Sequence, residues 1–122
     1  MNPVRINHTA VECGDEAGAE AALRAAIAAD PQGADAHSNL GLLLNERGGK
    51  AGAEAAWRAT IAADPQHAMA HSNLGAVLYE RGDVAGAARS FAAALKIDPA
   101  DAETKANLQI ALRALKEERR KV

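Results

Sequence analysis

The chain has 122 residues, of which 48% are hydrophobic, and a formal net charge of −2. This length supports one domain rather than two separate cores. Positive and negative residues are interspersed, so the sequence lacks the basic field that nucleic acid requires, and we expect no nucleic-acid partner. No window approaches 18 apolar residues and the N-terminus has no long apolar stretch, so we expect a soluble chain without a membrane or export signal. The single cysteine, Cys13, has no partner for an internal disulfide, which favours a cytoplasmic location.

The first predicted element, over residues 2–13, is the least regular. Val4 and Ile6 are β-branched and indifferent to helix formation. Ile6, Ala10 and Cys13 nevertheless have helical spacing. The pattern predicts a degenerate, frayed helix in which Cys13 is a buried small hydrophobic residue.

A stronger helix is predicted over residues 15–29. Asp15 is a suitable N-cap, alanines dominate the segment, and Leu23 and Ile27 provide an apolar stripe. Pro31 ends the helix, because the residue before a proline is pushed out of the α region.

Five further helices follow in chain order. They are predicted over residues 34–47, 51–63, 68–81, 84–97 and 102–121. The turns are marked by Gly48-Gly49, Asp64-Pro65, Gly82-Asp83 and Asp98-Pro99. Because every loop has two to five residues, neighbouring helices are expected to form antiparallel hairpins stacked in order. No segment shows a strand pattern, so the predicted fold class is all-α.

The sequence repeats with a period of 34 residues. Residues 30–63 and 64–97 are identical at 18 of 34 positions without a gap, and residues 15–29 match 49–63 at 11 of 15. We therefore expect two full repeats, 30–63 and 64–97, inside a single domain of residues 1–122.

The residues shared by the two units resemble the tetratricopeptide repeat. The resemblance rests on Leu40-Gly41 and Leu74-Gly75 in the first helices, Ala53 with Trp57 and Ala87 with Phe91 in the second helices, and the closing Pro65 and Pro99. It implies an α-solenoid of antiparallel hairpins wound into a right-handed superhelix. Gly41 and Ala53 are small, which allows the helices of one hairpin to approach closely.

Both ends depart from the family pattern. Gln109 takes the glycine position of the last unit, which is acceptable only where no second helix folds back on it. Residues 98–122 are therefore expected to form a C-terminal capping helix. Asn7 takes the same position in the first unit, so residues 1–29 are expected to be a degenerate, partial repeat.

The resemblance implies that the first helices of the repeats line a concave groove, which receives an extended peptide or a partner helix. Helical phase places the following residues on that groove: Asp35, Ser38, Asn39, Leu42, Asn45, Met69, Ser72, Asn73, Ala76, Tyr79, Asn107 and Ile110. Asp35, Glu46, Glu80 and Glu103 lie in or beside it. The groove should therefore favour a neutral or basic ligand.

Asn39, Asn73 and Asn107 are the most specific feature of the predicted groove. Each amide offers a donor and an acceptor, so a ladder of them can hold the main chain of a peptide without reading its sequence. The arrangement is similar to an asparagine ladder of tetratricopeptide superhelices. The competing interpretation is that asparagine is common at this family position and is simply solvated.

One subclass of the family, which binds the C-terminal carboxylates of chaperones, needs several Lys and Arg residues in the groove. At the corresponding places this chain has Val4, His8, Asn39, Met69 and Asn73. We therefore expect no such clamp.

Two histidines, His67 and His71, are four residues apart, as in a metal-binding pair. No third ligand follows at fixed spacing, so packing roles at the helix start and rim are favoured over a metal site. The sequence also lacks a catalytic Ser/His/Asp set and a P-loop. We expect neither enzymatic activity nor a cofactor or metal.

Three functions stay open at the sequence level. The leading hypothesis is a protein–protein interaction scaffold that binds a segment of another protein. The second is self-assembly, for example as a homodimer, in which another copy covers the apolar side of residues 15–29 that the weak N-terminal unit leaves open. Two full repeats are also fewer than a stable solenoid usually needs. The third is that the chain is the targeting arm of a larger enzyme.

Overall fold

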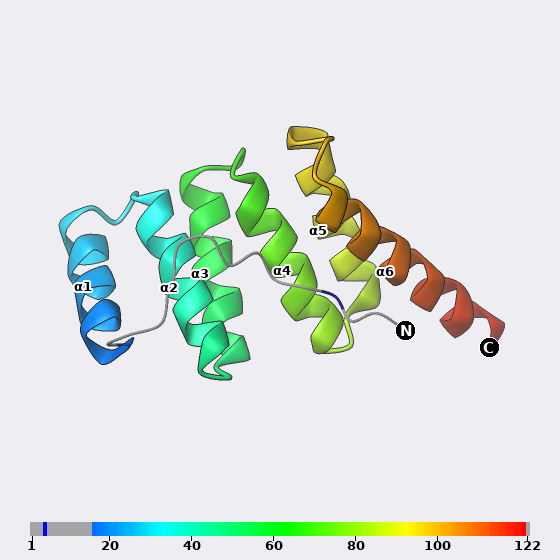
Figure 1. Cartoon of the computed structure of the whole chain (residues 1–122), viewed down its shortest axis with the longest axis horizontal. Helices are drawn as coiled ribbons and strands as arrows, with labels where there is room; N and C mark the ends of the chain where they lie inside the picture. Colours follow the sequence, from blue (N-terminus) through cyan, green and yellow to red (C-terminus); the bar gives the residue numbers. More distant parts are fainter. Residues whose placement is uncertain (1–3, 5–15, 122) are drawn as a thin grey trace.

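The computed structural model describes Val4 and residues 16–121. Six α-helices follow one another as α1 (Glu16–Ala29), α2 (Ala34–Glu46), α3 (Lys50–Ala63), α4 (Ala68–Glu80), α5 (Val84–Ile97) and α6 (Ala102–Arg120). They stand side by side in a row that runs from α1 at one end to α6 at the other (Figure 1). The all-α fold of stacked hairpins is confirmed, and the helix bounds agree with the predicted ones to within two residues.

The predicted helix over residues 2–13 lies outside the described residues except for Val4, whose backbone belongs to no helix. Cys13 and the proposed Asp15 cap also lie outside them. None of the helices in the described part of the chain combines the length and apolar character that a bilayer span requires.

Local sequence signals set the helix ends. Gly48 and Gly82 follow α2 and α4 with φ of 83° and 93°, which is a conformation that side chains disfavour. Between hairpins, the Asp64 carboxylate accepts a hydrogen bond from the backbone N–H of Gln66 at 3.1 Å. This side-chain turn, followed by proline, separates α3 from α4.

Each hairpin is closed by one aromatic ring that packs on one glycine. A Cβ atom on Gly41 would lie 2.5 Å from Nε1 of Trp57, and one on Gly75 would lie 2.7 Å from Cε1 of Phe91. Both rings are wholly buried, and Trp57 Nε1 donates a hydrogen bond to the Ser38 carbonyl at 3.2 Å. The predicted close approach of the helices therefore depends on these rings.

Successive hairpins are linked by a repeated set of charges. Glu54 on α3 pairs with Arg58 at 3.0 Å and with Arg81, which follows α4. Glu20 on α1 pairs in the same way with Arg24, at 2.9 Å, and with Arg47. The hydrogen bonds from Arg24 and then Arg47 lower the pKa of Glu20 from its ordinary value of 4.5.

Candidate functional site

The predicted groove residues differ widely in exposure, although all lie on α2, α4 and α6. Asp35 is exposed. Those of intermediate burial are Asn39, Asn45, Met69, Tyr79 and Ile110, and those buried are Ser38, Leu42, Ser72, Asn73, Ala76 and Asn107. The face that helical phase assigns to the groove is therefore partly enclosed.

The three asparagines take equivalent positions on the three helices. Asn39 is half-buried, Asn73 is wholly buried and Asn107 is 2% exposed. In such an environment an amide hydrogen bond is worth more than in water, and an unmade one costs more. The three asparagine side chains can therefore bind the main chain of a peptide only if the peptide inserts between α2, α4 and α6.

A pocket of about 580 Å³ lies between the end of α4 and α6. Its lining consists of Tyr79, Ile110, Arg113, Ala114, Glu117, Glu118 and Lys121. Tyr79, Ile110 and Ala114 also pack against the hydrophobic core, so the floor of the pocket is apolar. The last three lining residues were not predicted as site residues, because a run of charges at a helix end usually marks a solvated terminus.

The acidic character of the groove is partly neutralised. Lys50 on α3 binds Glu80 at 2.6 Å and donates a hydrogen bond to the Asn45 side chain at 2.9 Å. Oε1 of Glu103, at the other end of the groove, is buried and has no hydrogen-bond partner among the described residues. A buried carboxylate oxygen without a donor is costly, and a ligand N–H at this position would satisfy it.

Ser72 has a packing partner that the sequence did not reveal. Its Oγ lies 2.8 Å from Oγ1 of Thr104 on α6, and both side chains are buried. Thr104 in turn donates to the Asp101 carboxylate at 2.7 Å. These contacts connect α4 to the start of α6, two helices that are adjacent in space but separated by a whole helix in the chain.

The histidines have structural partners. His67 is the N-cap of α4, where Nδ1 accepts a hydrogen bond from Ala70 N at 3.2 Å, and Nε2 lies 3.4 Å from the Asp35 carboxylate. His71 Nε2 lies 2.9 Å from the Pro65 carbonyl oxygen, and His37 makes the equivalent contact with Pro31. Within the described residues, no three His, Cys, Asp or Glu side chains gather as metal ligands do.

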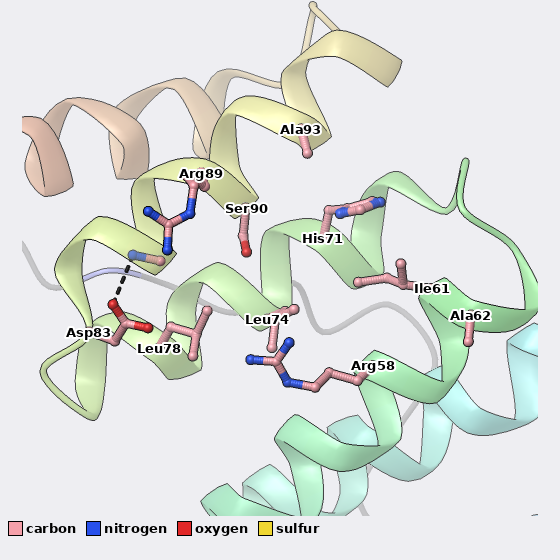
Figure 2. A pocket seen from close by; sticks show the side chains of 11 residues that line it. Arg58, Ile61, Ala62, His71, Leu74, Leu78, Asp83, Arg89, Ser90 and Ala93 are labelled. Carbon is pink, nitrogen blue, oxygen red and sulfur yellow. Dashed lines mark hydrogen bonds between the residues drawn. The ribbon is translucent and has the colours of Figure 1, made fainter.

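A second hollow, of about 460 Å³, lies where α3, α4 and α5 meet. Figure 2 shows Arg58, Arg89 and Ser90 around it, with Leu74 and Leu78 at its apolar side. Asp83 lines it as well, but its carboxylate accepts a hydrogen bond from Gly86 N at 2.9 Å. None of the predicted groove residues lines this hollow, which makes it a useful reference surface.

A family model described as tetratricopeptide repeat matches residues 8–57 and 46–102. The chain belongs to the tetratricopeptide repeat family. Its fold is that of a protein–protein interaction scaffold. Among curated proteins, no significant match was found.

Three solved structures show the same tetratricopeptide fold. A mutant of O-GlcNAc transferase from Thermobaculum terrenum is 33% identical with a TM-score of 0.74, over 81% of this chain but only 19% of that one. The first tetratricopeptide domain of Spaghetti (RPAP3), bound to an HSP90 peptide, is 20% identical with a TM-score of 0.79, over 84% of this chain and 81% of that one. MamA is 21% identical with a TM-score of 0.79, over 85% of this chain and 61% of that one.

Proposed function

We propose that the face formed by α2, α4 and α6 binds an extended segment of another protein. The observation that carries this proposal is the asparagine ladder of Asn39, Asn73 and Asn107, placed at one position of three neighbouring helices. The RPAP3 domain, which was solved with an HSP90 peptide, supports peptide binding by this fold. The tetratricopeptide family in general supplies scaffolds rather than catalysts.

The ligand is expected to be neutral or basic. Asp35 is exposed at the start of α2, and the buried Oε1 of Glu103 lacks a donor among the described residues. A backbone N–H or a lysine of the ligand would supply that donor. Met69 and the asparagines stand where a carboxylate-binding groove needs cations, so an acidic chaperone tail is not expected to bind.

The ladder is tested by measuring peptide binding to a double variant. We expect Asn39→Ala with Asn73→Ala to weaken the binding of neutral and basic peptides at least tenfold, because main-chain hydrogen bonds are lost whatever the peptide sequence. The measurement is fluorescence anisotropy with peptides chosen from an array, after circular dichroism has shown that the variant is folded.

The matched control is Arg58→Ala with Arg89→Ala in the second hollow (Figure 2), which should leave peptide affinity unchanged. Equal affinity of the asparagine variant and the unmodified chain would contradict the proposal. Equal losses in both double variants would also contradict it, because the effect would then not belong to the groove.

Self-assembly is the second candidate, and one observation favours it. Among the described residues, Leu112 on α6 is the large apolar side chain most open to solvent, with 51% exposure. If the outer face of α6 joins two copies, light scattering should show a mass that rises with concentration, and Leu112→Glu should abolish the rise. A monomer at millimolar concentration would rule this candidate out.

A third proposal is that the chain is the targeting arm of a larger enzyme. It is supported by the match to O-GlcNAc transferase, of which this chain covers 19%. A reading frame that continues into a catalytic domain would support it, and a reading frame of this length alone would contradict it.

A further inference from the structure

Val4 is buried in a cluster of residues that are distant from it in the sequence. Its side chain is 8% exposed, although it precedes the first described helix and belongs to no helix itself. It is part of the same hydrophobic cluster as Leu42 on α2 and Ala76 on α4. Both of these residues belong to the face that helical phase assigns to the groove.

The same face is enclosed where an empty groove would leave it open. Asn73 and Ala76 on α4 are wholly buried, and Asn107 on α6 is 2% exposed. The hydrogen bond between Ser72 and Thr104 joins α4 to the first turn of α6. At the other end of α4, a pocket lies between Tyr79 and the side chains of α6. Val4 is itself buried and belongs to the same hydrophobic cluster as Ala76, so it lies in this enclosed part of the molecule.

The geometry points to Val4 as an intramolecular ligand of the groove: its side chain occupies the apolar subsite that an aliphatic side chain of a partner peptide takes. This inference rests on the proposed peptide-binding function. The subsite has Leu42 and Ala76 in the buried cluster, and half-buried Tyr79 and Ile110 packed against it. These are apolar surfaces suited to a valine or isoleucine.

The sequence around Val4 has the chemistry that the groove favours. Residues 1–9 contain Arg5 and no acidic residue. Glu80 is paired with Lys50, but Asp35 and Glu103 also lie in or beside the groove, so a basic segment is attracted and an acidic one is repelled. The partner class that follows is an extended, neutral or basic segment with one aliphatic side chain in the place of Val4.

Tethering makes this ligand a competitor of the partner. A segment joined by a short linker acts at an effective concentration of the order of millimolar, without any contribution from the bulk solution. The apparent affinity for a partner peptide equals its affinity for the open subsite multiplied by the fraction of molecules in which Val4 has left that subsite. The partner must therefore displace Val4, and weakening the hold on Val4 should increase the affinity.

The experiment compares the full-length chain with its Val4→Asp variant. The probe is a fluorescein-labelled synthetic peptide with the sequence of residues 1–9, titrated in anisotropy measurements. We expect it to bind the variant at least tenfold more tightly than the unmodified chain, because an aspartate is disfavoured in the apolar, acid-rimmed subsite. Equal affinity for the two chains would overturn the inference.

Two controls separate a specific effect from a general one. Ala55→Asp introduces the same charge at an exposed position of α3, outside the groove, and should leave the affinity for the probe unchanged. A probe that carries Asp in place of Val4 should not bind the Val4→Asp chain. Binding of that altered probe would overturn the inference, because the subsite would then not be selective for an aliphatic side chain.

Methyl NMR gives a readout that does not depend on how the variant folds. In the unmodified chain we expect nuclear Overhauser contacts between the Val4 methyls and side chains of the groove, including the ring of Tyr79, the chain's single tyrosine. They should disappear as the unlabelled probe is added in excess. Val4 methyls with solvent-exposed shifts would overturn the inference.

These outcomes also separate this inference from the proposed function. If the probe binds the unmodified chain and the Val4→Asp chain equally, the groove is still a peptide site but Val4 does not occupy it. Conversely, the Val4 methyls could show the expected contacts while the Asn39→Ala, Asn73→Ala double variant binds peptides normally. The proposed role of the asparagines would then be wrong, and the proposed position of Val4 in the groove would be supported.

Discussion

Gly75 illustrates how single residues set the spacing of the helices. It lies on α4 opposite the ring of Phe91, and the first atom of any side chain there would come within 2.7 Å of that ring. Phe91 is wholly buried, and buried side chains are closely packed, so its ring cannot move into solvent to make room. Gly41 and Trp57 repeat the arrangement one unit earlier.

We expect Gly75→Ala to lower the free energy of unfolding by about 1–3 kcal/mol, because the added methyl group overpacks the hairpin. The matched control is Gly52→Ala on α3, whose new Cβ would meet only the mobile end of Leu44, at 3.1 Å. There the gain in helix propensity, about 0.5–1 kcal/mol, should dominate. Urea unfolding measures both, and a Gly75→Ala chain as stable as the control would refute the account.

At the scale of elements, the start of α6 is fixed by side-chain hydrogen bonds rather than by apolar packing alone. Asp101 caps the helix by accepting from Thr104 N at 3.3 Å and also accepts from the Thr104 hydroxyl. Because the Thr104 proton is used in that bond, Ser72 on α4 is the donor to Thr104. The chain of contacts aligns α6 with α4 in the absence of a following helix.

Thr104→Val should therefore lower the free energy of unfolding by about 1–3 kcal/mol, because it leaves the buried Ser72 hydroxyl without its partner. Adding Ser72→Ala should cost little more, since both polar groups are then gone. A double-mutant cycle from urea unfolding measures this coupling. Strictly additive effects would show that the hydrogen bond does not hold the two helices together.

The whole solenoid is joined by interactions between consecutive hairpins, and the charge sets of Glu20 and Glu54 are its repeated device. Each carboxylate reaches an arginine on its own helix and a second one just beyond the next first helix. Such exposed pairs are individually weak, but they occur at the same place in each unit.

Acid should loosen the contact between α1 and α2. Arg24 and Arg47 lower the pKa of Glu20 in the folded chain, so its contribution to stability is complete above the unfolded value near 4.5 and is lost as the pH falls through the lower folded value. Glu20→Gln should flatten the decrease in melting temperature between pH 6 and pH 3. Glu118→Gln, an exposed position on α6, serves as the control, and an identical effect of both variants would contradict the prediction.

The sequence by itself determined the repeat, the helices α1 to α6 and the order of the hairpins, whereas the further helix predicted over residues 2–13 lies almost wholly outside the described residues. These depend on local signals: helical periodicity, glycines with positive φ after α2 and α4, and the Asp-Pro turns. It also placed the groove positions on α2, α4 and α6, because phase along a helix follows from spacing. The assignment of those positions to peptide binding stays a prediction.

Only the tertiary structure decided which of these positions are open. Asn39 and Asn73 stand at the same place in two nearly identical units, yet one is half-buried and the other wholly buried. The difference comes from residues distant in the chain, because burial depends on what lies across the surface and not on local spacing. The same reason explains Val4: a valine in a weak helical pattern carries no local signal that it joins the buried cluster of Leu42 and Ala76.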